Sequence, residues 1–572
     1  MQSINYLKGR MFLGAGWFLF LLFCVVTEPG SAQDRSVFFL PLPASADSTI
    51  ETKTVDADET FDQGIPGWNA YMRLWRSHHA DPNNSAIRRF LGLPLEDSFV
   101  FQARRGRTAP KWLGWRAGSF AQVDTSHFSI YSTADEATTY RVAEDLERCF
   151  WVWTQLFFPM WEGASQIAVA LKDCGPDESM QTYLETHRPR ITSRRKFQVV
   201  LCKDVDQYRR TLKAESNGIE LSTGFYSDPL RTIFLYDELE DAAETRRHEL
   251  AHQLFREATR SALGQTAPGA DDSFWLVEGI AGYMESMVVE SRTATVGGWD
   301  SPRLQFARYR VLANRDLIEP DDLMRDGQRQ AQGRADLARW YSHAIANVHM
   351  LMDGGDRANK RWVYDELASL YQMRWRSEEK SESVESRLRA NWGIDLQRFL
   401  AVNDSDLVSG KVRRPLRELC LTGCGVSDVG LKSINPSEDL VWLDLARLPI
   451  SSEVIEALAP NPSKMEQLTL EVTKIDRQLL GWLEQANNLR ELDLSWTMVD
   501  DEFAGAIENM RELTVLWLTG TRLTDQSVDV LIDLPKLQSL DVQRTQISDA
   551  GLSRLRAARP RLQLNPLELR SP

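Results

Sequence analysis

Apolar residues recur at a fixed interval over the C-terminal part of the chain. A Leu-x-x-Leu-x-Leu pattern begins at Leu416 and returns every 24 or 25 residues. Its copies are Leu416-Leu419-Leu421, Leu440-Leu443-Leu445, Met465-Leu468-Leu470, Leu489-Leu492-Leu494, Leu513-Leu516-Leu518 and Leu537-Leu540-Val542, with a truncated copy at Leu562-Leu564. Several copies continue into a turn and a short helical stretch, such as "VSDVGL" and "ISDAGL". Each unit therefore predicts one short strand and one return helix, which bury their leucines only when the units stack.

This periodicity resembles the leucine-rich repeat family, and the resemblance implies a repeat solenoid over residues 409–572. The residue between the last two apolar positions of each copy is expected on the concave face of the solenoid. These residues are Cys420, Asp444, Thr469, Asp493, Trp517 and Asp541. Asp444, Asp493, Trp517 and Asp541 form a candidate surface for a protein partner, although a solvated face without a partner accounts for the same stripe. Cys424 fills the Asn-or-Cys position of the repeat, which favours a buried structural thiol over a metal ligand.

Upstream of the repeats, helical and strand periodicities alternate along the chain. Helices are predicted at residues 67–93 and 142–157, and Pro159 should end the second one. Short apolar runs predict strands at residues 127–132, 166–171, 197–202, 222–227 and 232–236, with a hairpin turn at "SDPLR" between the last two. The order of these elements predicts an α+β domain over residues 121–408, preceded by a mostly helical accessory region over residues 33–120.

The N-terminus has the order of a secretory signal. Two basic residues precede an apolar run from Met11 to Val26, and the small residues of "PGSA" follow at positions 29–32. The run is short for a membrane span, which needs about 20 apolar residues, although an uncleaved anchor is the alternative. Residues 1–32 are therefore predicted to be a signal peptide. Its removal would leave an exported protein, periplasmic, at the cell surface or extracellular, without a membrane attachment.

Charge and cysteine content narrow the classes of function. The formal net charge of −14 argues against a nucleic-acid partner, because such partners require a basic patch. Beyond Cys24 the cysteines are Cys149, Cys174, Cys202, Cys420 and Cys424. An odd and sparse set does not form a disulfide framework, although one bridge among the first three is compatible with an oxidising compartment.

The stretch "RRHELAHQLF", residues 246–255, carries the strongest chemical signal in the chain. His248 and His252 are one helical turn apart, so both imidazoles can reach one point. Glu249 lies beside them, about 100° further round the helix. Two imidazoles at this spacing suit zinc, and the neighbouring carboxylate suits a general base. An ordinary helix that carries two histidines is the alternative, and a third ligand would decide between the two interpretations.

The stretch "SFWLVEGIAGYMESM", residues 273–287, offers that third ligand. Ser273 can cap the start of a helix, and Glu278 follows within its first turns. The neighbours of Glu278 are apolar, and a buried carboxylate needs a partner, for which a zinc ion is the obvious choice. Gly279 and Gly282 would let this helix approach the helix of the two histidines closely.

Together, "HELAH" and "WLVEGIAGYME" resemble the gluzincin branch of the zincin metallopeptidases, and a group of exported bacterial domains of unknown function with a peptidase-like centre. The resemblance extends over about residues 125–405 and is specific only in the two motif helices. It implies a zincin-like fold in which His248, His252 and Glu278 bind zinc and Glu249 is the general base. Zinc in such a site activates water for attack on a peptide carbonyl.

The resemblance also bears on the residues around the metal. Gluzincins stabilise the oxyanion with a tyrosine or histidine, and Tyr341 is the first candidate here and His343 the second, although Tyr341 could equally be a core residue. Some gluzincins have an acidic residue four positions after the third ligand. Gly282 occupies that position in this chain, so Glu285 or a backbone carbonyl would have to orient a histidine. The edge strand that holds an extended substrate is assigned by analogy to residues 232–236.

The sequence as a whole predicts an α+β zincin-like metallopeptidase domain followed by an α/β leucine-rich-repeat solenoid. The predicted function is an exported zinc metallopeptidase that hydrolyses peptide bonds with a zinc-activated water and docks its substrate or a partner on the repeats. Two alternatives stay open. One is a catalytically idle zincin-like scaffold that acts through its repeats, and the other is a zinc hydrolase of a non-peptide amide.

Overall fold

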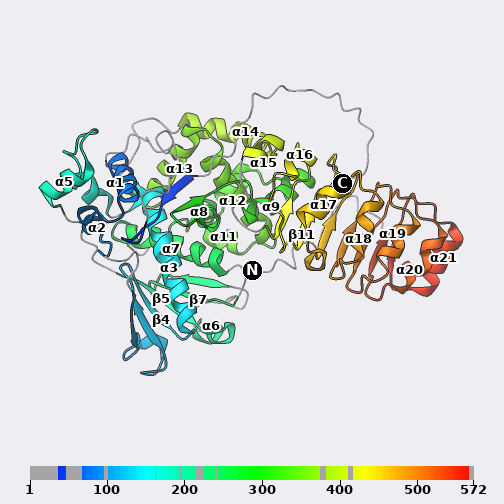
Figure 1. Ribbon diagram of the computed structural model, residues 1–572, viewed down its shortest axis with the longest axis horizontal. Helices are drawn as coiled ribbons and strands as arrows, with labels where there is room; N and C mark the ends of the chain where they lie inside the picture. The colour runs from blue at the N-terminus through cyan, green and yellow to red at the C-terminus, as the bar shows by residue number, and fades with distance from the viewer. Residues whose placement is uncertain are drawn as a thin grey trace.

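The computed structural model describes residues 36–46, 67–95, 101–161, 163–189, 191, 196–212, 223–238, 242–264, 266–373, 382–409 and 416–565. A body of helices and sheets is followed by a row of parallel strands and short helices that extends away from it (Figure 1). The predicted signal peptide, residues 1–32, lies outside the described residues. Within the described ranges, no helix has both the length and the apolar character that crossing a membrane requires.

The body is built around a six-stranded sheet with the order β2-β3-β4-β5-β7-β6. Strands β4, β5 and β7 are parallel, whereas β2, β3 and β6 run antiparallel to their neighbours. The strands are β2 Gln102–Arg105, β3 Ala121–Asp124, β4 Phe128–Ser132, β5 Phe197–Cys202, β6 Gly224–Ser227 and β7 Thr232–Tyr236. The assignment of residues 232–236 to the edge was wrong, because β7 pairs on both sides, and among the described strands β6 lies at this edge of the sheet and β2 at the other.

Helices pack on the inner strands of this sheet and build most of the rest of the body. They are α1 Trp68–Ala80, α2 Ser85–Leu91, α3 Glu136–Leu156, α4 Ala164–Ala170, α5 Met180–His187, α6 Val205–Leu212, α7 Ala242–Leu263, α8 Phe274–Glu285, α9 Pro302–Arg308, α10 Pro320–Arg325, α11 Gln328–Gln332, α12 Leu337–Asp353, α13 Arg357–Leu370, α14 Glu382–Leu400 and α15 Asp404–Ser409. The strand predicted at residues 166–171 is wrong, because that run lies in α4. Ile167 is fully buried while Val169 is 69% exposed, as two residues on opposite sides of a helix would be.

The described part of the predicted accessory region, residues 33–120, is built into the body and is only partly helical. Strand β1, Ser36–Phe39, pairs antiparallel with β9, Thr293–Val296, which also pairs with β8, Val288–Val289. Strand β2 extends the central sheet through β3. The indole of Trp68 in α1 donates a hydrogen bond to Gln155 O in α3, at 2.9 Å. A single hydrophobic core therefore joins this region to the rest of the body.

Helix α7 lies against β6, β7 and α3 on one side and against α8 on the other, and α8 packs in turn on α12. A Cβ at Gly279 would lie 2.4 Å from Val348 Cγ2, and one at Gly282 would lie 2.4 Å from Ile345 Cδ1. The two glycines thus allow α8 to approach α12 closely, and not α7 as predicted. Ser273 precedes α8, but its side chain makes no capping hydrogen bond, since its backbone is left-handed with φ 56°.

The C-terminal part forms the repeat structure that the periodicity predicts. Its parallel strands are β10 Glu418–Cys420, β11 Trp442–Asp444, β12 Gln467–Thr469, β13 Glu491–Asp493, β14 Val515–Trp517, β15 Ser539–Asp541 and β16 Gln563–Leu564. The return helices are α16 Asp428–Leu431, α17 Ser452–Leu458, α18 Leu480–Leu483, α19 Asp501–Ala506, α20 Val528–Asp533 and α21 Asp549–Ala558. The central leucine of each repeat is in register with the next, which makes one continuous buried core.

Helix α9 joins the body to the first two repeats. Its residue Gln305 accepts a hydrogen bond from Cys420 N at 3.1 Å, and Phe306 stacks on Trp442 with ring centroids 5.0 Å apart. Cys420 and Trp442 alternate with the inward-facing leucines, so α9 covers the concave face at this end of the solenoid (Figure 1).

The predicted concave stripe is therefore largely closed to solvent. Asp444 and Asp493 are each 1% exposed, and Cys420 is fully buried. Asp444 accepts the N–H of Ala446, and Asp493 accepts the N–H of Ser495. The prediction of an exposed aspartate surface is wrong for these two residues, because their carboxylates hold the following turns. Thr469, Trp517 and Asp541 stay half-buried.

The five cysteines beyond the predicted signal peptide all lie within described ranges, and all are free thiols. No bridge joins Cys149, Cys174 and Cys202. Cys424 is half-buried with its Sγ 3.8 Å from Leu400 O, which agrees with a structural role in the first repeat.

Candidate metal centre

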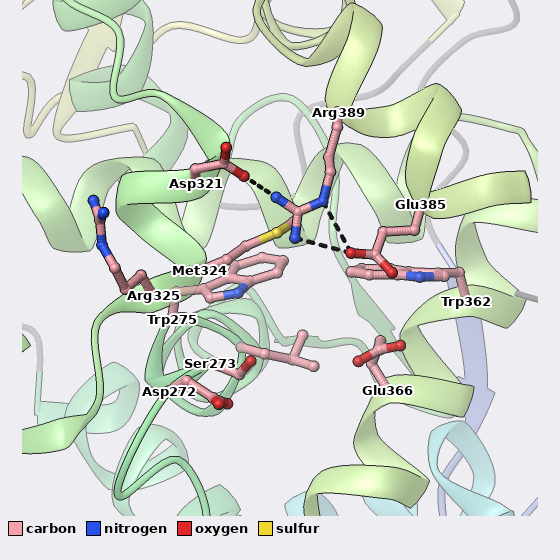
Figure 2. Close-up of a pocket in the computed structure, with 11 residues that line it drawn as sticks. Asp272, Ser273, Trp275, Asp321, Met324, Arg325, Trp362, Glu366, Glu385 and Arg389 are labelled. Atoms are coloured by element: carbon pink, nitrogen blue, oxygen red, sulfur yellow. Dashed lines mark hydrogen bonds and ion pairs between the residues drawn. The ribbon is translucent and has the colours of Figure 1, made fainter. Parts of the chain in front are cut away.

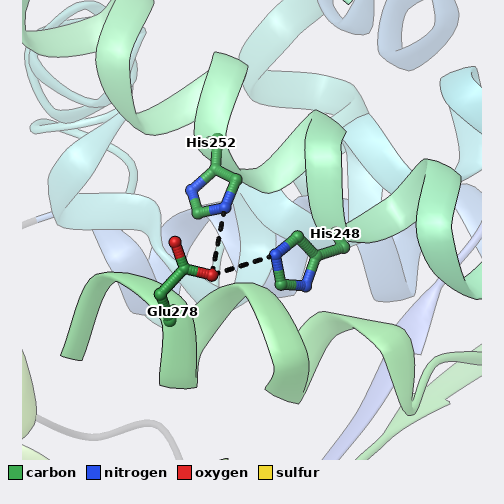
Figure 3. A group of neighbouring side chains, drawn as sticks. All are labelled: His248, His252 and Glu278. Atoms are coloured by element: carbon green, nitrogen blue, oxygen red, sulfur yellow. Dashed lines mark ion pairs between the residues drawn. The ribbon is translucent and has the colours of Figure 1, made fainter. Parts of the chain in front are cut away.

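The two histidines of α7 and Glu278 of α8 converge on one point between the helices. Figure 3 shows both imidazoles directed from α7 towards the carboxylate on α8. Glu278 Oε2 lies 3.3 Å from His248 Nε2 and 3.7 Å from His252 Nε2. One donor atom from each of the three residues lies within 4.8 Å of the other two. The sequence-predicted ligand set is thus brought together by the packing of two helices.

The other nitrogen of His248 is held by Glu285, from the last turn of α8. His248 Nδ1 lies 2.7 Å from Glu285 Oε1. Glu285 in turn accepts two hydrogen bonds from Arg303 of α9, Nε to Oε2 at 2.6 Å and Nη2 to Oε1 at 3.1 Å. Glu278 and Glu285 are seven residues apart, so both point from one face of α8 towards α7. Of the two orienting groups that the sequence left open, the structure has Glu285.

The electrostatics of the site favour a bound cation. Burial alone would lower the pKa of His248, but its contacts with Glu278 and Glu285 outweigh burial and raise that pKa to about 10. Burial would raise the pKa of Glu285, yet Arg303 and His248 lower it to about 2. The pKa of Glu278 is lowered in the same way, against its burial, by the two histidines. A proton on His248 therefore offsets part of the negative charge of Glu278 and Glu285. A bound metal ion could offset that charge instead.

Glu249, the predicted general base, is fixed against the open edge of the sheet. Its Oε2 accepts a hydrogen bond from the backbone N–H of Tyr226 in β6 at 2.8 Å. Glu249 and Tyr226 both line a cleft of about 390 Å³ that also contains the three converging residues. The helix with the histidines thus places its carboxylate between the metal-ligand cluster and the edge strand.

The two candidates for the oxyanion-stabilising residue separate clearly. Tyr341 of α12 lines the same cleft, and its pKa is raised well above the usual value by burial and by the charges of Glu278 and Glu249. His343 is directed elsewhere, with its ring nitrogens 2.9 Å from Arg339 O and 2.8 Å from Asp316 O. The second choice, His343, is therefore wrong, because backbone carbonyls engage both of its nitrogens.

The donor set fits zinc. Two imidazole nitrogens and one carboxylate oxygen are the protein ligands of many catalytic zinc sites. Tetrahedral ligands at zinc bond lengths lie about 3.3 Å from one another. Glu278 Oε2 lies 3.3 and 3.7 Å from the two imidazole nitrogens, near this spacing, and the three donor atoms all lie within 4.8 Å of one another.

A second pocket, of about 520 Å³, opens on the far side of α8 and has a different character. Trp275 and Trp362 form its apolar walls. Arg389 forms ion pairs with Asp321 and Glu385, whereas Glu366 lies across the pocket from them (Figure 2). Burial and the nearby carboxylates Glu385, Asp365 and Asp272 raise the pKa of Glu366 to about 7. Nothing in this lining matches the donor set of the metal centre.

Two contributors to the site were not identified from the sequence. Arg303 comes from a helix whose pattern carries no chemical signal, and only the folded chain places it at Glu285. Tyr226 contributes a backbone N–H, which residue identity does not encode. The role of Glu285 had a usable signal, since its spacing of seven from Glu278 puts both on one helix face.

Comparisons with known proteins bear on the repeats. A model of the Leucine Rich repeat family matches residues 414–434 and 533–555. Among solved structures, an internalin from Listeria monocytogenes matches at 18% identity and a TM-score of 0.21, covering 26% of this chain and 47% of that one. An internalin C2 from the same organism matches at 20% identity and a TM-score of 0.19, covering 28% of this chain and 81% of that one. No curated protein matches the chain.

The chain thus spans about half the length of the first of these internalins. The family match and the register of the parallel strands define the C-terminal part as leucine-rich repeats, a class of module that mediates protein interactions. The body before the repeats is a mixed helix-and-sheet structure.

Proposed function

We propose that this protein is a zinc-dependent metallopeptidase with a zincin-like body and a leucine-rich-repeat module that docks a substrate or partner protein. The observation that carries the proposal is the convergence of His248, His252 and Glu278 beside Glu249, inside a cleft that borders an open sheet edge. A ligand cluster alone would suit a structural metal. A neighbouring carboxylate and an adjoining cleft are what hydrolysis additionally requires.

Each side chain has a role that follows from its position. His248, His252 and Glu278 would hold the metal, which when bound supplies Lewis-acid activation of water and of the scissile carbonyl. Glu249 can accept a proton from the attacking water and return it to the leaving amine, because its carboxylate is held in the cleft. Tyr341 stays protonated at neutral pH and can donate a hydrogen bond to the developing oxyanion.

Strand β6 would bind the substrate backbone. Among the described strands it lies at one edge of the sheet, and its residues Gly224, Phe225 and Tyr226 line the cleft. An extended peptide can add to such an edge through main-chain hydrogen bonds, leaving side chains to set specificity. This arrangement favours a peptide over a small non-peptide amide.

The metal centre is tested by the zinc content of the purified full chain and of His248→Ala. We expect about one zinc ion per chain, lost in His248→Ala because one of three ligands is gone. His187→Ala is the matched control, since His187 is exposed near the end of α5 and far along the chain from the cluster. Absence of zinc from the wild type, or equal zinc content in wild type and His248→Ala, would contradict the proposed metal site.

Catalysis is tested by Glu249→Gln on a library of unstructured peptides. We expect the substitution to keep zinc but to lower the cleavage rate by a factor of about 10² to 10⁴, the usual contribution of a general base. A zinc-loaded wild type that cleaves no peptide in the library would instead favour the catalytically idle scaffold. The export implied by the N-terminal sequence is proposed on the same footing, and N-terminal sequencing of the protein from its native host would test cleavage after Ala32.

A further inference from the structure

One edge of the repeats carries an exposed row of apolar and basic side chains. The row consists of the residues two and four positions beyond the last apolar residue of each strand motif, and we call it the turn ridge. Its members from the second repeat to the sixth are Arg447, Pro449, Val472, Lys474, Trp496, Met498, Gly520, Arg522, Arg544 and Gln546. Val472 is 47% exposed, Trp496 46% and Met498 52%, which are among the most exposed large apolar side chains described.

The backbone of the turn ridge is rigidly held. Val472 and Trp496 have φ of 55° and 58°, a left-handed conformation that glycine adopts easily and a β-branched or bulky residue rarely does. Gly520, the equivalent residue one repeat on from Trp496, has the same left-handed conformation, with φ 69°. The N–H of Val472 donates to Ser495 O at 2.9 Å, and that of Trp496 to Thr519 O at 2.7 Å, so neighbouring repeats fix each turn.

The indole of Trp496 is also held in place. A Cβ on Gly520 would lie 2.4 Å from the Trp496 ring, so the absence of a side chain there leaves room for the indole. The guanidinium of Arg544 lies over the ring, 5.5 Å from its centroid. A rigid aromatic side chain loses little conformational entropy on binding, and tryptophan beside arginine is the composition of many binding hot spots.

The charge of the turn ridge indicates the kind of partner that it would bind. The turn ridge has Arg447, Lys474, Arg522 and Arg544 around its apolar centre and no acidic residue at its own positions, in a chain whose formal net charge is −14. One of the four, Arg447, pairs with the buried Glu471 beneath it. We propose that the turn ridge docks an acidic protein segment, which places an apolar side chain against Trp496, Val472 and Met498 and its carboxylates against the surrounding cations.

This inference rests on the docking role proposed above for the repeats and gives that role a location and a chemistry. On the concave face α9 contacts the first repeat, and Asp444 and Asp493 are buried, whereas the apolar side chains of the turn ridge are exposed. The first position of the same row, Gly423, already packs against Leu312 of the body. The ridge therefore begins at the body and runs away from it along the repeats.

The test uses the full chain and a library of fluorescent peptides, each with one large apolar residue flanked by aspartate and glutamate, beside a matched library with lysine flanks. We expect saturable binding to members of the acidic library only, weakening as salt is raised. Trp496→Gly should weaken that binding about tenfold or more. Glycine suits the left-handed turn, so this variant removes the indole without a demand on the fold.

Lys474→Glu combined with Arg522→Glu should weaken binding to a similar degree, and Val429→Ser is the control. Val429 is 67% exposed but lies on α16, away from the turn ridge, so its loss should leave binding unchanged. Zinc content and peptide hydrolysis of the same samples separate failure of the ridge from failure of the metal centre. The proposal is overturned by equal binding to both libraries or to neither, by unchanged binding in Trp496→Gly, or by Trp496-dependent binding to phosphatidylglycerol vesicles in place of peptides.

Discussion

Arg303 contacts no predicted metal ligand, yet it is tied to His248 through one carboxylate. Its guanidinium holds Glu285 by two hydrogen bonds, and Glu285 holds His248 Nδ1. Groups in this position fix the orientation of the ring and raise its affinity for metal. Arg303 is therefore a positioning residue, which acts on His248 through Glu285 without contacting a predicted metal ligand itself.

Arg303→Leu should weaken zinc binding about tenfold, because Glu285 would lose both donors and His248 its fixed orientation. Competition with a chromophoric chelator measures the effect directly. Arg303→Lys restores the charge but not the paired geometry, so its affinity should fall between that of the wild type and that of the leucine variant. Identical affinity in all three proteins would show that the contact of Glu285 with Arg303 does not support the site.

Glu366 gives a pH-dependent prediction that does not involve the metal. Its pKa in the folded chain is about 7, above the ordinary value of 4.5, because it is partly buried and near other carboxylates. Between these two pH values the folded state keeps a proton that the unfolded chain has released, so the free energy of unfolding falls as pH rises. The destabilisation is complete once pH exceeds the folded-state value.

Glu366→Gln removes this titration, and its free energy of unfolding should therefore fall less than that of the wild type between about pH 5 and about pH 8. Urea unfolding at both pH values measures the difference. Glu185→Gln is a suitable control, since Glu185 is exposed on α5. Parallel pH dependence in wild type and Glu366→Gln would contradict the proposed protonation.

At the scale of the element, the packing of α8 overrides its intrinsic helix propensity. Alanine is a better helix former than glycine by about 1 kcal/mol. A Cβ at Gly279 would nevertheless lie 2.8 Å from Ala344 O and 2.4 Å from Val348 Cγ2. Gly279→Ala should therefore destabilise the protein by about 1 to 3 kcal/mol, the usual cost of overpacking, as measured by chemical denaturation.

Gly505 provides the opposite case in a helix of the repeats. It lies in α19, and no atom within 4 Å would meet an added Cβ. Gly505→Ala should stabilise the protein by about 0.5 to 1 kcal/mol, because the added methyl group meets no neighbour and alanine has the higher intrinsic helix propensity. A higher free energy of unfolding in Gly279→Ala, or a lower one in Gly505→Ala, would show that the surroundings of these helices differ from those described.

The elements differ in how far the sequence alone predicts them. The repeats were predictable because their period is long and each copy places its leucines at the same positions. The cluster of His248, His252 and Glu278 was predictable because both motifs are local: one helical turn fixes the two histidines, and one helix start carries the glutamate. The apolar run at residues 166–171 was not predictable, since a short run of this kind fits a strand or a helix equally well.

Relations between elements escaped prediction for a physical reason. The choice between β6 and β7 as the open edge depends on strand order, which no local pattern encodes. The helix that Gly279 and Gly282 approach depends on how three helices stack. The burial of Cys420 involves α9, whose Gln305 accepts the N–H of Cys420 from far away in the sequence. Each of these errors concerns the packing of one element against another, whereas most of the predicted helices and strands are present.

At the scale of the whole molecule, α9 links the candidate metal centre to the first repeats. Arg303 reaches Glu285 from one part of this short helix, and Gln305 and Phe306 contact Cys420 and Trp442 from the next. A bound metal stabilises whatever structure its ligands share. We therefore expect zinc to slow hydrogen exchange in α8, α9, β10 and β11 and to leave β14 and β15 unchanged.

Mass spectrometry of exchanged peptides, with zinc added or removed by a chelator, measures this effect. His248→Ala is the control, because zinc should then change none of these segments. Slowed exchange confined to α7 and α8 would show that the body and the repeats respond independently, despite the contacts that α9 makes with both.

The position of α9 also determines what happens to a shortened chain. Loss of the repeats after a protease cut would remove Trp442, whose aromatic surface contacts Phe306 and Tyr309. The body fragment would then expose the apolar face of Phe306 and Tyr309, a few residues from Arg303. Partial degradation products should thus aggregate or be cleared quickly, so that a cell would contain the intact chain or none of it.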